Sequence, residues 1–155
     1  MTKLPISTIL LRSIGGAGGI ALMAYLATAS HFPLMTIPFA TSIVMVLGGP
    51  ELKPARPRCV LGGHIICATA GIMCTQVLGY DIWVAAFAIG LAIALMHLFD
   101  AFHPPAGISP IIIAASHASP VFILTPVMTG AIILIAFAYV FHRITGEKWP
   151  VKQPD

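Results

Sequence analysis

Four long apolar runs constrain this chain more than any other feature of its sequence. They cover about residues 8–30, 61–79, 82–99 and 121–141, and each is long enough to cross a bilayer as a helix. Only 8% of the residues are charged and 58% are hydrophobic, whereas a soluble domain carries about a quarter charged residues. We therefore predict a single all-α transmembrane domain over residues 1–155, with lipid in place of water as the solvent.

Two further apolar stretches, 33–48 and 103–116, are interrupted by proline. As re-entrant loops they give four crossings, and as broken helices that pass through the bilayer they give six. Cytoplasmic loops hold the excess of Lys and Arg. With six crossings, segments 1–12, 49–60 and 142–155 share one side and contain every Lys and Arg in the chain. We favour four full spans plus two broken or half helices, in a bacterial inner (plasma) membrane with both termini cytoplasmic.

An internal repeat relates the two broken stretches. Sliding the chain by 67 residues places Pro38 on Pro105, Ser42 on Ser109 and Gly63 on Gly130 without a gap. We predict a duplication, with one repeat over about 8–79 and the other over about 80–146. Each repeat crosses the membrane an odd number of times, so the two would be inverted, a plan that recurs in transporters and also suits channels.

The paired prolines indicate two short helices that begin inside the membrane. Proline suits the first turn of a helix, and a helix start presents free N–H groups and a partial positive charge. Two such starts that converge from opposite faces favour a small anion. Simple kinks with local capping are the alternative, and Pro110 leaves the second start open between Pro105 and Ser109. The candidate substrate-binding residues are Phe39, Ala40, Thr41, Ser42, Ala106, Gly107 and Ser109.

Several histidines fall within or beside the apolar segments. His97, Asp100 and His103 are spaced three apart, which places them on one side of a helix and makes them a candidate proton relay. Structural or capping roles are the alternative, and the set is too small to predict a metal site. His64 and His103 join the candidate substrate-binding residues, with capping or snorkelling as the alternative for His64. The remaining histidines, His31, His117 and His142, lie at predicted segment ends and receive no role.

Other classes of function find little support in the sequence. It has no nucleotide-binding loop, nucleophile elbow or HExxH motif, so we expect neither an enzyme nor a cofactor. The net charge of +3 is scattered over segment ends, which argues against nucleic acid. The expected partners are a small inorganic anion and the lipid bilayer, with a homo-oligomer left open. We interpret Cys59, Cys67 and Cys74 as packing residues.

Two motifs resemble those of a known family. The string His103-Pro104-Pro105-Ala106-Gly107 and the stretch 57–64 (PRCVLGGH) are similar to signatures of the HPP family of small membrane proteins, as is the stretch 39–42 (FATS). The resemblance spans about residues 14–145 and departs at Cys59, where the family tends to have Asn, and at Pro110. The family is usually described with four spans, and its plant plastid members are associated with nitrite transport, so the resemblance implies nitrite as the substrate.

Together these features predict the transport of a small monovalent anion, with nitrite as the leading substrate, at the convergent starts of the two half-helices. A structural or accessory membrane subunit without transport is one alternative. A proton or metal-cation pathway through the membrane histidines is another. Channel and carrier mechanisms both fit the pattern.

Overall fold

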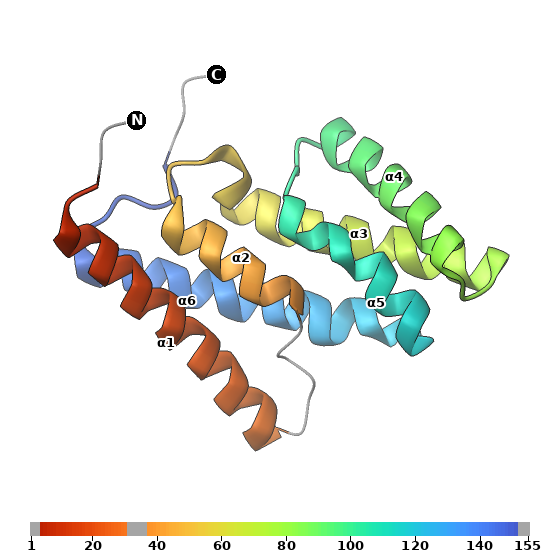
Figure 1. The fold of residues 1–155 in the computed structure, drawn as a ribbon, viewed down its shortest axis with the longest axis horizontal. Helices are drawn as coiled ribbons and strands as arrows, with labels where there is room; N and C mark the ends of the chain where they lie inside the picture. The colour runs from red at the N-terminus through yellow and green to blue at the C-terminus, as the bar shows by residue number, and fades with distance from the viewer. Residues whose placement is uncertain (1–3, 31–36, 152–155) are drawn as a thin grey trace.

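The regular structure of the chain is helical throughout the part that the computed structural model describes, residues 4–30 and 37–151 (Figure 1). This confirms the all-α prediction. The elements are α1 (Ile6–Ser30), α2 (Ile37–Gly48), η1 (Lys53–Ala55), α3 (Pro57–Leu78), α4 (Ile82–Leu98), η2 (Pro104–Ile108), α5 (Ser109–Ser116), η3 (Ile123–Met128) and α6 (Thr129–Thr145).

Three of the described helical segments are long and apolar enough to cross a membrane: α1, α3 and the joined η3–α6 segment. The shorter apolar helices are α2, α4 and the joined η2–α5 segment. The sequence predicted α4 as a full span, and its 17 residues rise about 26 Å against a hydrocarbon core of about 30 Å. The first part of the proline-interrupted stretch 33–48, residues 33–36, lies outside the described residues.

Successive helices run in opposite directions, and the connecting segments that the structure describes lie toward two ends of the molecule (Figure 1). At one end the Arg12 guanidinium donates to the carbonyl of Gly48 at 2.8 Å, and the Trp149 indole donates to the carbonyl of Ala55 at 3.1 Å. We call this the basic end, because it holds every Lys and Arg that the structure describes. These are Arg12, Lys53, Arg56, Arg58, Arg143 and Lys148.

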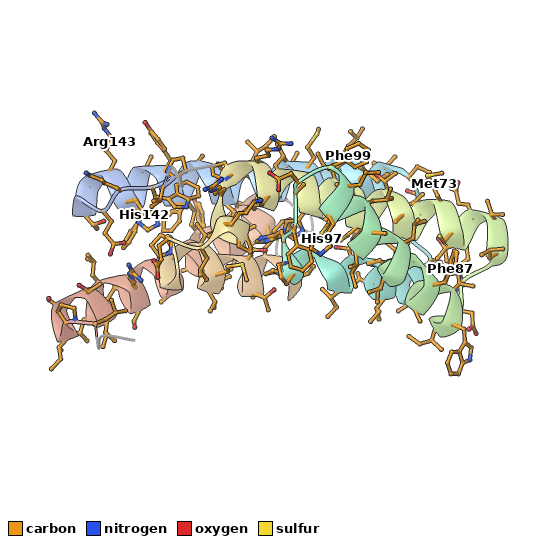
Figure 2. All side chains as sticks on the ribbon, turned by 90° about the horizontal axis from the view of Figure 1, so that it is seen from above. Met73, Phe87, His97, Phe99, His142 and Arg143 are labelled. Carbon is orange, nitrogen blue, oxygen red and sulfur yellow. The ribbon has the colours of Figure 1, made fainter. Side chains whose placement is uncertain are left out.

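The opposite end joins the connections after α3 and α5. The Tyr80 and His117 rings stack there with centroids 4.5 Å apart, and Asp81 caps α4 by accepting a 2.8 Å hydrogen bond from the Trp83 N–H. Between the two ends, large apolar side chains such as Met73 and Phe87 point outward from the bundle, where lipid would surround them (Figure 2).

Two pairs of helix boundaries are separated by the 67-residue offset found in the sequence. α2 begins at Ile37 and η2 begins at Pro104, which is 67 residues later. α3 and α6 each end one residue before a glycine with a positive φ, Gly79 at 96° and Gly146 at 75°, and these glycines are also 67 apart. Glycine adopts this conformation without the penalty that a Cβ atom would bring.

The interior is divided among three groups of buried apolar side chains. One lies between α1, α2 and α6, and it includes Met23, Phe39 and Leu134. A second joins α3, α4 and η2 around Cys67 and Met96, and a third joins α3, α5 and η3. The second and third groups share α3, while Val60 brings the start of α3 into the first. Polar groups on the inner side of α3 therefore lie at the centre of the molecule.

Candidate functional site

A serine and two histidines meet at this centre. The Ser42 hydroxyl oxygen lies 2.8 Å from Nε2 of His64 and 2.8 Å from Nε2 of His103. All three side chains have 0% exposure, and they come from α2, from α3 and from the residue before η2. We call these three residues the Ser42 cluster.

Glycine at the start of α3 lets the cluster form. A Cβ atom on Gly63 would lie 2.6 Å from the His103 Cβ and 3.1 Å from the carbonyl oxygen of Ala101. The chain before η2 therefore rests directly against α3, which places His103 beside His64. Their ring centroids are 5.2 Å apart. Glycine permits such close approach, and the contact that Gly63 makes is with the chain segment that carries His103.

His103 links the cluster to the basic end. Its Nδ1 lies 2.7 Å from the carbonyl oxygen of Pro54, which belongs to η1. A carbonyl can only accept, so this nitrogen carries a hydrogen and donates it. The hydrogen bond holds the ring in one orientation, with Nε2 directed at Ser42. A polar path thus runs from η1 through His103 and Ser42 to His64.

Phe39 covers the other side of His64. Its ring centroid lies 5.0 Å from that of His64, and the side chain is 1% exposed. A Cβ atom on Gly130 would come within 2.4 Å of the Phe39 ring, so the glycine leaves the space that the ring fills. Gly63 and Gly130 are 67 residues apart; Gly63 makes room for His103 of the Ser42 cluster, and Gly130 makes room for Phe39 beside it.

Two buried polar atoms, one in α3 and one at the start of α5, have no hydrogen-bond partner among the described residues. They are Nδ1 of His64 and the hydroxyl oxygen of Ser109, whose side chain is 1% exposed. Most buried polar groups in proteins are paired, so each such atom needs an explanation. Ser109 lies 67 residues after Ser42, and the residue 67 positions after His64 is Ala131. No imidazole therefore stands at that offset to pair with Ser109.

The helix start after His103 combines the two alternatives that the sequence left open. A 3-10 turn begins at Pro104, the α-helix begins at Ser109, and Pro110 is its second residue. Ala106 is buried in the group around Met96, and Gly107 is partly exposed. The Ser109 side chain is buried as well.

Ala40 and Thr41 lie outside the Ser42 cluster. Both are exposed on the outer side of α2, and the Thr41 hydroxyl donates to the carbonyl of Pro38 at 2.9 Å. Thr41 faces a groove of about 800 Å³ whose other wall includes Pro104 and Pro105. The groove therefore runs along the contact between α2 and η2, on the outside of the cluster.

The structure does not place His97, Asp100 and His103 on one helix face, so that prediction is wrong. α4 ends at Leu98, and Asp100 follows with a positive φ of 51°. The exposed His97 ring stacks on Phe102 with centroids 4.4 Å apart. The Asp100 carboxylate is paired with the Lys53 ammonium at 2.5 Å, and this hydrogen bond lowers the pKa of the exposed carboxyl group. Only His103 reaches the centre.

His142 has a structural role that sequence reasoning missed. Its side chain is fully buried, with Nε2 3.2 Å from the carbonyl oxygen of Val46 and Nδ1 3.0 Å from a Glu147 carboxylate oxygen. Glu147 also accepts a 3.1 Å hydrogen bond from Arg12. Figure 2 shows Arg143 projecting away from the ribbon while His142 lies among the helices. His142 therefore fastens the ends of α1, α2 and α6 together.

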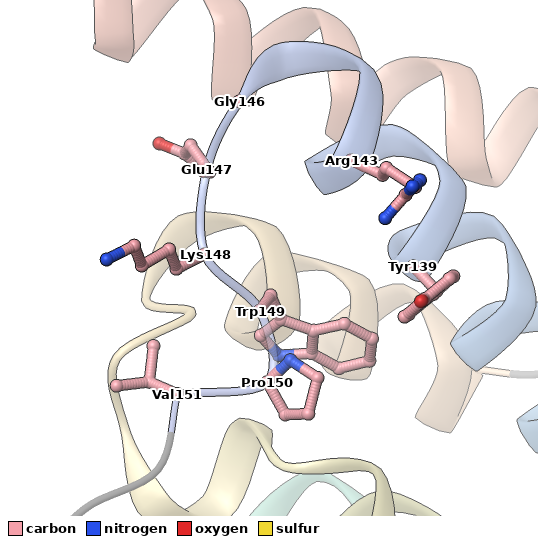
Figure 3. A pocket seen from close by; sticks show the side chains of 8 residues that line it. All are labelled: Tyr139, Arg143, Gly146, Glu147, Lys148, Trp149, Pro150 and Val151. Atoms are coloured by element: carbon pink, nitrogen blue, oxygen red, sulfur yellow. The ribbon is translucent and has the colours of Figure 1, made fainter.

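A pocket of about 650 Å³ lies beside this junction, lined by Tyr139, Glu147 and Trp149 among others. Figure 3 shows that its two basic side chains, Arg143 and Lys148, lie on opposite sides and do not converge. Its carboxylate is already engaged by Arg12 and His142. This pocket is therefore a weaker candidate site than the Ser42 cluster.

The Ser42 cluster offers two imidazoles and no carboxylate or thiolate within its hydrogen-bonded set. Within residues 4–30 and 37–151, no group of three or more His, Cys, Asp or Glu side chains could hold a metal ion. The cluster is therefore chemically suited to donating hydrogen bonds and exchanging a proton.

The fold and this polar centre define a helical integral membrane protein with a buried histidine–serine site. The chain matches the HPP transmembrane region family over residues 1–150, so it belongs to that family. It is 31% identical over 142 residues to one transmembrane protein of Dictyostelium discoideum, covering 85% of this chain and 46% of the relative. A second transmembrane protein of that organism is 30% identical over 118 residues, covering 71% and 41%. The chain thus spans less than half the length of these relatives. No solved structure matches it.

Proposed function

We propose that this chain transports a small monovalent anion across a lipid bilayer, with nitrite as the leading substrate. The observation that carries the proposal is the composition of the centre. Ser42, His64 and His103 supply O–H and N–H donors in a fully buried site, and no carboxylate contributes to it. Hydrogen-bond donors that lie in apolar surroundings favour anions over cations.

The starts of the two short helices add to this preference. α2 and α5 extend in opposite directions from the middle of the molecule (Figure 1), and each start carries a partial positive charge. The unpartnered Ser109 hydroxyl lies in the first turn of α5. We place the anion between these starts, with the unpartnered Ser109 hydroxyl as donor and with Ser42 positioning His64 and His103. The groove beside Thr41, Pro104 and Pro105 is its approach.

The proposed topology follows from the same arrangement. Six alternating segments cross the bilayer, and residues 8–79 and 80–146 form two inverted repeats. The equal spacing of the helix boundaries and of the paired glycines supports this arrangement. We propose that the basic end, with both termini, faces the cytoplasm in a bacterial inner membrane, and the collected Lys and Arg residues support this orientation. We propose a transport protein without enzymatic activity or cofactor.

Uptake by reconstituted protein tests the proposal directly. Purified protein in liposomes should admit nitrite faster than empty vesicles of the same lipid. The Ser42→Ala and Ser109→Ala variants should reduce this uptake, and Ser116→Ala is a matched control because Ser116 is exposed near the end of α5 and bonds only to the carbonyl of Ile112. Uptake equal to that of empty vesicles would reject transport, and uptake that both variants leave unchanged would reject this site.

A packing subunit without transport is the second candidate function. The filled centre favours it, because Phe39 and the Ser42 cluster are buried almost completely. In that case Ser42, His64 and His103 would only fasten α2, α3 and η2 together. Nitrite uptake at the level of empty vesicles, with Ser42→Ala strongly destabilised, is the result that this function predicts.

A further inference from the structure

Two fully buried histidines have both ring nitrogens within hydrogen-bond distance of oxygen, and they differ in one respect. His142 lies between the Val46 carbonyl and the carboxylate of Glu147. His103 lies between the Pro54 carbonyl and the hydroxyl of Ser42. A carboxylate thus faces His142. A neutral carbonyl and a neutral hydroxyl face His103.

The contacts of the Ser42 cluster show how many hydrogens its ring nitrogens must carry. The Ser42 oxygen has three close neighbours, each at 2.8 Å: the Pro38 carbonyl, His64 Nε2 and His103 Nε2. A hydroxyl donates one hydrogen bond and accepts two, and a carbonyl only accepts. If Ser42 donates to Pro38, both imidazoles must donate to Ser42. Since His103 already donates from Nδ1 to Pro54, it then carries both ring hydrogens and one positive charge.

The same atoms also accommodate neutral His103. Its Nε2 then accepts, so the Ser42 hydroxyl turns from the Pro38 carbonyl to His103, while His64 continues to donate to Ser42. Between the two arrangements one hydroxyl hydrogen changes partner, and the Pro38 carbonyl gives up its hydrogen bond from Ser42. The cluster can therefore take up and release one proton on His103 by the rotation of one hydroxyl group.

Every carboxylate that the structure describes is engaged elsewhere. Glu147 pairs with Arg12 and His142, Glu51 lies 3.7 Å from Arg12, Asp81 caps α4, and Asp100 pairs with Lys53. A buried positive charge without a counter-charge is costly in a membrane protein. A monovalent anion bound beside His103 supplies that counter-charge.

We propose that His103 is a proton-binding site that couples transport to protons, with one proton and one anion crossing together; this inference rests on the proposed anion transport. His103 takes a proton from water on the uptake side, and its Nε2–H turns the Ser42 hydroxyl toward Pro38. The imidazolium then attracts the anion. On the release side the anion leaves, His103 returns the proton to water, and the Ser42 hydroxyl turns back. Charge and protons balance, because the two ions move as a neutral pair.

Few other titratable groups face His103. α2, η2 and α5 contain no titratable side chain. α3 contributes His64 within the cluster, and it carries Cys67 deeper in the core and Arg58 and Cys59 at its start. The chain around η1 carries Lys53 and Arg56 at the basic end, and the chain after α4 carries Asp100. Among these, only His64 shares a hydrogen-bond partner with His103.

Whether nitrite uptake carries net charge can be measured on the wild-type protein, and this measurement tests the inference. Proteoliposomes that contain a trapped pH-sensitive dye receive an inward nitrite gradient with equal pH on both sides. We expect the lumen to acidify by one proton per nitrite taken up, and the potassium ionophore valinomycin to leave the rate unchanged. Nitrite uptake without acidification, accelerated by valinomycin, would overturn proton coupling and leave anion transport standing. No uptake above empty vesicles would reject both.

The ring nitrogens of His103 provide a second, non-transport readout. Histidine labelled with 15N in the protein in liposomes gives separate signals for protonated and bare ring nitrogens, and His103→Gln identifies those of His103. Saturating nitrite should convert His103 from one protonated nitrogen to two. His117→Gln is the matched control, since His117 is exposed and stacks on Tyr80 at the opposite end. A ring that stays neutral under saturating nitrite would contradict the proposal.

Discussion

The hydroxyl oxygen of Ser42 lies 2.8 Å from Nε2 of His103, although 61 residues separate them in the chain. This contact joins the first proline-interrupted segment to the second. It forms because α2 supplies Ser42 in its second turn, and because the chain before η2 rests on Gly63 of α3. The contact therefore depends on three elements and reports whether all three are in place.

Removing the Ser42 hydroxyl should destabilise the protein more than removing its neighbour's. In Ser42→Ala the buried Nε2 atoms of His64 and His103 lose their shared partner, which costs about 1–3 kcal/mol. In Thr41→Ala an exposed hydroxyl is lost that bonds only to Pro38. Its effect should stay within about 0.5 kcal/mol. Thermal unfolding in detergent measures the difference, and equal losses for the two variants would contradict a connected cluster.

A methyl group on Gly63 should push the histidines apart. Gly63→Ala puts a Cβ atom 2.6 Å from the His103 Cβ and 3.1 Å from a backbone carbonyl. Relief needs a backbone shift, and overpacking of this kind costs about 1–3 kcal/mol. Gly90→Ala in α4 is the control, since a Cβ there meets nothing within 4 Å. It should be neutral or gain up to about 1 kcal/mol of helix propensity.

Unfolding temperature and nitrite uptake, measured for both variants, separate the steric effect at Gly63 from a general effect of adding a methyl group. Gly63→Ala should lower both the unfolding temperature and the nitrite uptake, whereas Gly90→Ala should lower neither. A stable Gly63→Ala protein with unchanged uptake would show that the separation of His64 and His103 does not matter.

The helices and the candidate residues could be predicted from the sequence, whereas the contacts between their side chains could not, for a physical reason. Hydropathy and charge located the helices, because lipid exposure and basic loops leave a pattern in each segment separately. Ser42, His64 and His103 were all named as candidates. That their side chains meet could not be predicted. The contact depends on how α2 and α3 are rotated about their axes, and on the packing of the chain before η2 against Gly63. His142 received no role, because its partners Val46 and Glu147 have no spacing that marks them in the sequence.

Glu147 should matter more to the basic end than Glu51. The Glu147 side chain is 19% exposed and serves both Arg12 and the buried His142. Glu147→Gln takes the carboxylate away from the buried His142 and leaves Arg12 with the more distant Glu51, and we expect a loss of about 1–3 kcal/mol. Glu51 is 61% exposed and 3.7 Å from Arg12, so Glu51→Gln should cost less than about 1 kcal/mol. Unfolding temperatures measured side by side check this order, and a larger loss for Glu51→Gln would contradict it.

The Lys53–Asp100 pair predicts a small dependence of stability on pH. The hydrogen bond from Lys53 lowers the pKa of Asp100 in the folded protein. Its contribution is therefore present above the pKa of an unfolded aspartate and is lost as pH falls through the folded value. Wild type should unfold at a higher temperature than Asp100→Asn at about pH 6, and the difference should decrease at a lower pH, below about 4. A difference that persists at the lower pH would assign it to something other than this carboxylate.

Labelling from the two sides of the membrane tests the proposed six crossings. Glu51 at the basic end and Ser119 after α5 are both exposed, and the odd number of crossings between them predicts opposite sides. The native cysteines, Cys59, Cys67 and Cys74, are buried and free, so alanine can replace them before Glu51→Cys and Ser119→Cys are introduced separately. In vesicles of known orientation, a membrane-impermeant maleimide should label one variant from outside and the other only after lysis.

Four crossings, with both proline-interrupted segments re-entrant, would put the 49–60 loop on the side opposite the termini. A tag at each terminus therefore serves as the reference. Labelling of Glu51→Cys from the face that lacks the tags would reject six crossings and the inverted repeat with them.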